Sequence, residues 1–330
     1  MNSCSAFAPA SVANVGPGFD VFGFALEGAG DTVTARRSDQ PGVRLLKIEG
    51  DGGRLPVGAD NIVCVVAAAM LRAANPGFGI ELFLFKGLPL GSGLGSSSAS
   101  AVAAAAAVNG LLVGAFDNKQ LLEFAREGER AACGAAHADN VAASLYGGFT
   151  MVAGEPPEVS VLKVPASWHA AVVHPHLELP TKKARAVISP AVSLANHTAT
   201  LAAAARLVAG IAGGDLAMVG RSVMGDRVAT PARAGLIPHY EQVVAAALQK
   251  GAAGASISGA GPSIFALTEG LEGAKVIADA MASVWRARGI ECDIIVSRMG
   301  APGARLAAEV PHANPLTALL RPLHQDLSAR

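Results

Sequence analysis

The sequence predicts an α+β protein built from two domains, and three observations support this. The 330 residues exceed the roughly 250–300 residues at which a single hydrophobic core stops growing. Apolar residues make up 51% of the chain and charged residues 16%, so there is enough apolar surface for large cores. The second half also follows the order strand–helix–strand–strand–helix–strand, which is typical of a ferredoxin-like split βαβ domain.

The first half mixes strands with helices. Short alternating runs indicate strands over 4–8, 31–36, 43–49 and 79–86, and the first two flank the turn-rich stretch VANVGPGFDVFGFAL. Longer periodic or alanine-rich runs indicate helices over 60–74, 96–112 and 117–132. Asp60 or Asn61 would cap the first of these helices. The segment 137–154 indicates a short helix, a Gly-Gly turn and a strand.

The second half begins after Pro156-Pro157, the strongest punctuation in the chain. We expect domains over 1–155 and 156–310, followed by a tail over 311–330. The expected strands are 168–175, two paired strands within 254–269, and 291–300. The expected helices are 197–214 and 273–289, with additional helical structure around 216–250.

Composition excludes several classes of protein. The formal net charge is zero, which argues against nucleic-acid binding driven by overall charge. The first residues lack the basic and apolar regions of a secretory signal, and no apolar run is long enough to span a membrane. The four cysteines show neither a C-x-x-C pair nor metal-ligand spacing, so we expect free thiols in a reducing, cytoplasmic compartment.

The segment PLGSGLGSSSAS, residues 89–100, runs directly into the alanine-rich helix. A helix start presents unpaired N–H groups and the positive end of the helix dipole, and glycines let the backbone approach an anion closely. Serine hydroxyls add donors and can ligate Mg²⁺. The segment could therefore hold a triphosphate although no lysine follows the glycines, or it could be an ordinary glycine turn with serine caps.

Two further glycine-rich segments occur, PASVANVGPGFDVFG at 9–23 and SGAGPSIFAL at 258–267. In the first, Asn14 and Asp20 could hold a small ligand, although a turn is the alternative interpretation. In the second, the backbone of glycines such as Gly259 could close over a substrate, although a hairpin turn is the alternative.

Together, in this order and spacing, the three segments resemble the signature motifs of the galactokinase, homoserine kinase, mevalonate kinase and phosphomevalonate kinase (GHMP) superfamily. HADNVAASLYGGF and DRVATPARAGLIP extend the resemblance to its homoserine kinase branch, over about residues 4–300. The resemblance implies an N-terminal ribosomal-protein-like β/α domain with a left-handed βαβ unit and a C-terminal ferredoxin-like domain. It also implies ATP-dependent phosphorylation of the L-homoserine side-chain hydroxyl to O-phospho-L-homoserine, for threonine biosynthesis, by a cytoplasmic homodimer.

The resemblance also assigns residues to ATP and Mg²⁺. The phosphate loop would comprise Pro89, Leu90, Gly91, Ser92, Gly93, Leu94, Gly95, Ser96, Ser97 and Ser98. Ser97 and Glu129 would ligate Mg²⁺, which prefers few protein oxygens plus phosphate oxygens. For Glu129 the alternative is a solvated helix face. Asn61 and Lys86 match positions near the nucleotide base, with a helix N-cap and a solvated strand-end lysine as their alternatives.

The residues implied for the acceptor suit a zwitterionic amino acid. They are Asn14, Asp20, His137, Asn140, Arg185, Arg233 and Gly259. Asp20 would pair with the α-ammonium group, and the two arginines would clamp the α-carboxylate, since guanidinium matches that planar anion. His137 and Asn140 would position the hydroxyl. The alternatives are surface arginines and a core histidine, and Asp139 is expected to be structural.

Asn140 also bears on the mechanism. Mevalonate kinase relatives place an aspartate eleven residues after the magnesium glutamate, and here that position is Asn140. An amide cannot act as a general base near neutral pH, so Asn140, Glu129 and Ser97 would support direct in-line transfer. The alternatives are a relative acting on another small alcohol, of the mevalonate or shikimate type, or a non-catalytic sensor of ATP and a small ligand.

Overall fold

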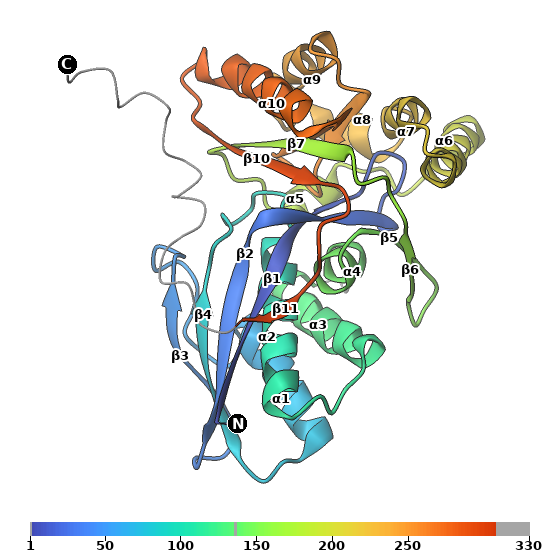
Figure 1. Ribbon diagram of the computed structural model, residues 1–330. Coiled ribbons are helices and arrows are strands. Elements are labelled where there is room, and N and C mark those ends of the chain that lie inside the picture. Colours follow the sequence, from blue (N-terminus) through green and yellow to red (C-terminus); the bar gives the residue numbers. More distant parts are fainter. Residues whose placement is uncertain (1, 135–136, 308–330) are drawn as a thin grey trace, which may run out of the picture.

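Two β-sheets organise the protein (Figure 1). The computed structural model describes residues 2–134 and 137–307. The larger sheet has seven strands in the order β11-β1-β2-β4-β3, with β5 added to β2 and β6 to β5. Its strands are β1 (Ser3–Ala13), β2 (Phe22–Ser38), β3 (Val43–Glu49), β4 (Gly79–Phe85), β5 (Phe149–Ala153), β6 (Glu158–Leu162) and β11 (Arg305–Ala307).

Three helices pack against this sheet, α1 (Ile62–Ala74), α2 (Ser96–Leu111) and α4 (Asp139–Tyr146), and α3 (Asn118–Cys133) packs against these helices. The alanine-rich α2 is buried along most of its length and contacts β1, β2, α1 and α3. Small side chains allow this close approach, so the run AVAAAAAV forms the centre of the domain. Asp117 begins α3 with a capping box that includes Gln120. The strands β3 and β4 are parallel and connected through α1.

The second sheet has the order β10-β7-β9-β8, and each neighbouring pair is antiparallel. Its strands are β7 (Trp168–Pro175), β8 (Gly254–Ile257), β9 (Ile264–Glu269) and β10 (Cys292–Arg298). The helices of this half are α5 (Thr181–Ala186), α6 (Leu194–Gly213), α7 (Leu216–Val223), α8 (Ala229–Ala234), α9 (Tyr240–Gln249) and α10 (Leu271–Arg286). The strand order confirms the ferredoxin-like domain predicted from the sequence.

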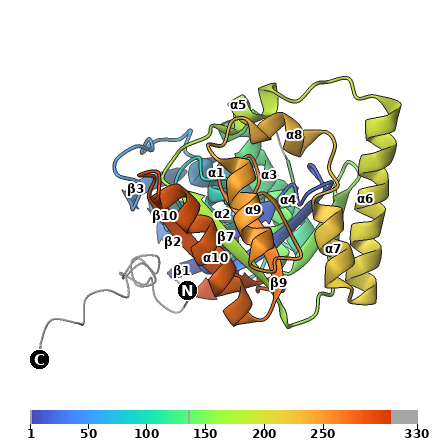
Figure 2. The ribbon, with the colours of Figure 1, turned by 90° about the horizontal axis from the view of Figure 1, so that it is seen from above.

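The two sheets share a hydrophobic core. Phe24 of β2 and Phe265 of β9 meet edge to face with ring centroids 5.8 Å apart, and Phe149 of β5 stacks on Phe24. The opposite face of the second sheet is covered by α9 and α10, around the buried Trp285 (Figures 1 and 2). Loops at the junction of the two sheets therefore lie between the first sheet and the second sheet.

Two expectations differ from the structure. The stretch between the first two predicted strands is not mainly a turn, because β1 continues to Ala13 and β2 begins at Phe22 and runs to Ser38. Glycine and proline in that stretch suggested a longer loop, but long-range pairing between β1 and β2 extends both strands. The strands β6 and β11 lie beyond Pro156 yet pair within the first sheet. The domain division therefore stays a prediction, and the tail 311–330 lies outside the described residues.

Within residues 2–134 and 137–307, no helix has the length and apolar character needed to cross a membrane. Cys4, Cys64 and Cys292 are buried free thiols. Burial raises the pKa of each of these thiols, to about 11 for Cys64 and Cys292. The side chain of Cys133 lies outside the described part of the chain.

Candidate active site

Three glycine-rich segments meet where the two sheets face each other. They are the segment 9–23, the loop 89–95 before α2, and the turn 258–263 between β8 and β9. Ser11 N–H donates to the Leu94 carbonyl at 3.0 Å, and Gly259 N–H donates to the Ala13 carbonyl at 2.9 Å. Motifs that lie far apart in the sequence therefore form one site.

The phosphate loop is fixed by its carbonyl groups. Four consecutive carbonyls accept hydrogen bonds from other segments: Gly91 from Leu179 N–H (3.0 Å), Ser92 from Ser263 Oγ (2.7 Å), Gly93 from Ser258 Oγ (2.8 Å) and Leu94 from Ser11 N–H (3.0 Å). In a trans peptide the carbonyl and the following N–H point in opposite directions. Because these carbonyls point toward the surrounding protein, the N–H groups of residues 92–95 point away from it, on the side where an anion could bind.

The loop ends at Gly95, the N-cap of α2. Gly95 has φ 67° and provides no side-chain cap, so the first amides of the helix remain available to an anion. A Cβ atom at Gly95 would lie 2.3 Å from Ser11 Oγ and 2.7 Å from Asn140 Oδ1. Only glycine fits between these two side chains.

Lys86 lies beneath the loop, so the alternative of a solvated strand-end lysine is wrong. It is 3% exposed and pairs with the buried carboxylate of Asp31. The ammonium group also donates to the carbonyl and hydroxyl of Ser96, at 2.9 and 2.8 Å, and to Ser100 Oγ at 3.0 Å. These partners occupy the donors of the ammonium group, so Lys86 supports the start of α2, and a contact with the nucleotide base stays a prediction.

Asn61 caps α1. Its Oδ1 accepts from Val63 N–H at 3.2 Å, and its Nδ2 donates to the Pro56 carbonyl at 2.9 Å. The alternative interpretation of Asn61 as an N-cap is confirmed, and a contact with the nucleotide base stays a prediction.

Ser97, Glu129 and Asn140 lie on three different helices around the loop. Ser97 is the second residue of α2 and is half-buried. Glu129 on α3 is 8% exposed, so the alternative of a solvated helix face is wrong. Asn140 is the second residue of α4, and its Oδ1 accepts from Ser11 Oγ at 2.9 Å beside Gly95.

The predicted acceptor residues gather beside the phosphate loop. Asp20 accepts from Arg185 Nη2 at 2.7 and 3.0 Å, and His137 Nδ1 lies 3.4 Å from its carboxylate. Asn14 Oδ1 accepts from Asp20 N–H at 2.9 Å and so fixes the turn that carries this carboxylate. Arg233 is 2% exposed and donates to the Gly259 carbonyl at 2.9 Å, so the interpretation of Arg233 as a surface residue is wrong.

Comparison with known proteins places this site in a family. Residues 61–148 match the family model "GHMP kinases N terminal domain", and residues 202–287 match the family model "GHMP kinases C terminal". Homoserine kinase from Chloroherpeton thalassium is 40% identical over 319 residues, covering 93% of this chain and all of that protein. The chain belongs to the homoserine kinase family of the GHMP kinases. The homoserine kinase of Pyrococcus furiosus is also 40% identical, over 89% of this chain and 97% of that protein.

Solved structures agree with this assignment. The crystal structure of homoserine kinase from Cytophaga hutchinsonii has a TM-score of 0.90 and 47% identity, covering 93% of this chain and 98% of that one. Mevalonate kinase from L. major, at 16% identity and a TM-score of 0.69, shares the fold. The two-domain α+β GHMP fold predicted from the sequence is therefore confirmed.

Burial shapes the electrostatics of this GHMP site. It lowers the pKa of His137, while the Asp20 carboxylate acts in the opposite direction. It also lowers the pKa of Arg233, and the nearby Arg185 adds to that effect. Within the described chain, His137 Nε2 and Arg185 Nε are buried without a hydrogen-bond partner. Two polar atoms that face no protein partner are suited to a polar ligand.

Sequence reasoning missed three residues of this family site. Phe19 lies under both arginines, whose guanidinium carbons are 4.8 and 5.0 Å from its ring centroid. Its position next to Asp20 was the available signal. Ser11 contacts Asn140 and Asp31 pairs with Lys86, and each partner lies far away in the sequence. No local sequence pattern therefore predicts a role for Ser11 or Asp31.

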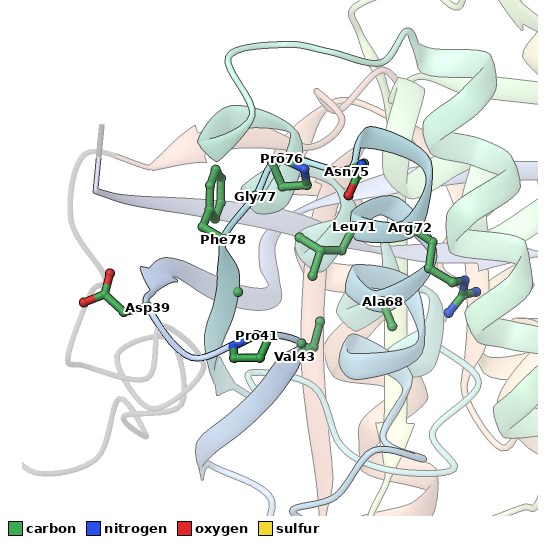
Figure 3. A pocket seen from close by; sticks show the side chains of 12 residues that line it. Asp39, Pro41, Val43, Ala68, Leu71, Arg72, Asn75, Pro76, Gly77 and Phe78 are labelled. Atoms are coloured by element: carbon green, nitrogen blue, oxygen red, sulfur yellow. The ribbon is translucent and has the colours of Figure 1, made fainter.

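A separate hollow of about 520 Å³ lies at the far end of α1, away from the motifs (Figure 3). Leu71 and Phe78 provide apolar walls, and Asp39 and Arg72 lie at its border. None of the predicted site residues lines this hollow. The candidate active site is instead the junction of the three glycine-rich segments.

Proposed function

We propose that the chain transfers the γ-phosphoryl group of ATP to the side-chain hydroxyl of L-homoserine, forming O-phospho-L-homoserine on the route to threonine. The observation that carries this proposal is the cluster of Asp20, Arg185 and Arg233 beside the phosphate loop. Homoserine kinases at 40% identity over nearly the whole chain support the same activity.

The cluster suits a free amino acid because it carries both signs of charge. Asp20 and Arg185 pair with each other, and a zwitterion can take both partners. The α-ammonium would replace the guanidinium at Asp20, and the α-carboxylate would take Arg185 with support from Arg233. Asn140 lies beside Gly95 of the loop and His137 lies beside Asp20, and these two side chains would hold the side-chain hydroxyl.

The phosphates of ATP would lie on the amides of Gly91 to Ser97. Ser97 supplies a hydroxyl and Glu129 a carboxylate, and this oxygen donor set fits Mg²⁺, which takes its remaining ligands from phosphates and water. When bound, the ion would neutralise charge on the transferred phosphoryl group. Lys86 stays beneath the loop and contributes through the backbone that it supports.

Position 140 holds an asparagine, whose amide cannot act as a general base, in place of the aspartate of mevalonate kinase relatives. Phosphoryl transfer has a loose, in-line transition state, so positioning and charge neutralisation provide most of the rate. Asn140, fixed by Ser11, would align the hydroxyl, whose proton would leave to a phosphate oxygen or to water late in the reaction.

A coupled assay of ADP release over a panel of alcohols tests the proposal. We expect turnover of L-homoserine to exceed that of mevalonate, shikimate and galactose. Mevalonate has no ammonium group and would leave Asp20 without a counter-ion, so preference for mevalonate would overturn the substrate assignment. Tight binding of ATP and homoserine without transfer would instead indicate a sensor.

We also propose a cytoplasmic homodimer that contacts its partner through α6. This helix lies at the edge of the molecule beside α7 (Figure 2). Its exposed residues include Leu194 at 80% and Leu201 at 59%. Arg206 and His197 are the only ionisable side chains within Leu194–Gly213. A helix that is apolar on nearly every side is normally buried, and a second copy of the same surface would bury it without unpaired charges.

A further inference from the structure

His174 on β7 is a buried histidine outside the acceptor cluster. It is 3% exposed, and its Nδ1 lies 3.1 Å from Ser263 Oγ. Ser263 is the last residue of the third glycine-rich turn and makes two hydrogen bonds to the phosphate loop. Its Oγ donates to the Ser92 carbonyl at 2.7 Å, and its N–H reaches the same oxygen at 3.3 Å.

The protons in this chain of contacts can be assigned. A serine hydroxyl has one hydrogen, and that of Ser263 is used by the Ser92 carbonyl. His174 Nδ1 must therefore carry a hydrogen and donate it to Ser263 Oγ. Burial lowers the pKa of His174 to about 4, so the ring is neutral near pH 7 and one of its nitrogens carries the single proton.

The contact controls one amide of the phosphate loop. The Ser92 carbonyl and the Gly93 N–H belong to the same trans peptide and point in opposite directions. Gly93 has φ 78°, and its backbone is pressed against the third turn, since a Cβ there would lie 2.5 Å from the Ser258 carbonyl. Rotation of the Ser92–Gly93 peptide would withdraw the Gly93 N–H from the phosphate side, and the bond from Ser263 opposes that rotation.

We propose that His174 is a positioning residue for ATP: it orients the Ser263 hydroxyl, which holds the Ser92–Gly93 peptide with its N–H toward the phosphates. This inference rests on the proposed role of the loop in binding ATP. It gives the second domain a direct part in preparing a nucleotide site that lies on the first domain.

Two amide substitutions separate this role from general packing. Asparagine places a nitrogen where histidine has Nδ1, whereas glutamine places it one atom farther out. His174→Asn should keep the KM for ATP and the affinity for ADP with Mg²⁺ close to wild type. His174→Gln should raise the KM for ATP and the Kd for ADP about three- to tenfold, which is the effect of losing one hydrogen bond. The KM for homoserine should stay unchanged in both variants.

The control is His176→Gln, the same change two residues away, where the imidazole is half exposed and pairs with Asp293. It should leave the affinity for ADP unchanged. Equal weakening by His174→Asn and His174→Gln, or a parallel rise in the KM for homoserine, would show that His174 acts through packing alone.

Ser263→Ala provides the second measurement. If His174 acts only through the Ser263 hydroxyl, His174→Gln should add little to the loss of ADP affinity already caused by Ser263→Ala. Additive effects, compared at equal thermal stability, would overturn the proposal. Because ADP binding needs no acceptor, this measurement decides the role of His174 even if homoserine is not the substrate.

Discussion

At the scale of single residues, two oppositely charged side chains of the proposed acceptor site pair with each other. The Asp20 carboxylate is held by Arg185, and both side chains remain partly exposed, at 28% and 37%. An exchange of this pair for the two charges of an amino acid would cost less than leaving either group unpaired. The residues that pair in the free site are therefore the ones that we propose bind the substrate.

Asp20→Asn tests this exchange. The variant keeps the shape of the side chain but removes the charge that would face the α-ammonium. We expect the KM for homoserine to rise at least tenfold, since a hydrogen bond to a charged group contributes about 1.5–3 kcal/mol. Steady-state kinetics give the answer, with an unchanged KM for ATP as the control. An unaltered KM for homoserine would remove the ammonium contact.

Glu129→Gln tests the proposed Mg²⁺ ligand. Loss of the carboxylate should lower kcat by orders of magnitude at saturating ATP, with only a small change in melting temperature. The matched control is Glu127→Gln on the same helix, which disturbs only an exposed pair with Arg72. Normal turnover of Glu129→Gln across a Mg²⁺ titration would exclude Glu129 from the site.

Asp139 introduces a dependence of stability on pH. Its side chain is buried, and burial, helped by Asp20 and Glu129, raises its pKa from 3.8 to about 7. A carboxyl with a raised pKa stabilises the fold fully below its unfolded pKa and loses that contribution as pH rises toward 7. Asp139→Asn removes this loss and keeps an acceptor for Asn140 N–H.

The melting temperature of Asp139→Asn should therefore exceed that of the wild type at pH 8, by roughly 2–4 °C for each kcal/mol recovered. The two proteins should converge near pH 4–5. Parallel melting curves from pH 5 to pH 8 would mean that Asp139 is ionised throughout.

At the scale of secondary structure, local patterns predicted most helices and strands to within a few residues. The helix α1 begins after Asn61, and α3 begins after Asp117, because N-cap side chains are local signals. The length of β2 and the burial of Lys86 could not be predicted. The length of β2 depends on its pairing with β1 and β5, and the burial of Lys86 depends on the pairing of β2 with β4.

The Asp31–Lys86 pair shows what such pairing produces. Asp31 on β2 also accepts from Gly87 and Leu88 N–H, at 3.0 and 3.2 Å, and from Ser100 Oγ at 2.6 Å. One carboxylate thus joins a strand, the start of the phosphate loop and α2. Serine and glycine marked the loop in the sequence, but the charge pair beneath it had no local marker.

Lys86→Met should leave the Asp31 charge buried without its counter-ion. We expect a loss of about 3–5 kcal/mol in the free energy of unfolding, measured by urea denaturation. The double variant Lys86→Met, Asp31→Asn should recover part of this loss, because no buried charge remains. A loss below about 1 kcal/mol for Lys86→Met would mean that the pair contributes little to the loop.

At the scale of the whole molecule, the candidate active site is built from both halves of the chain. Leu179, Ser258 and Ser263 from the second half hold loop carbonyls, and Arg185 and Arg233 complete the acceptor cluster. Neither half has the full site alone. The motifs allowed this convergence to be predicted by family resemblance, whereas the individual hydrogen bonds required the packing of the two sheets.

The exposed apolar face of α6 is also a property of the whole molecule. Leu194 and Leu201 would each expose a large side chain to water in a monomer, and Arg206 is the one residue of α6 that carries a charge near pH 7 when histidine is neutral. A dimer would bury them, so light scattering after size exclusion should give a mass near twice that of the chain. Leu201→Glu should shift the protein to the monomer, because it would bury an unpaired carboxylate from each subunit in an apolar contact.

The control is Val276→Glu on α10, where the side chain is 52% exposed but the surrounding helix has charged residues. It should stay dimeric. A monomeric wild type at micromolar concentration, or a dimer that survives Leu201→Glu, would overturn the proposed dimer through α6. If Leu201→Glu gives a monomer with normal kcat, each subunit carries a complete site, as expected from an acceptor cluster built within one chain.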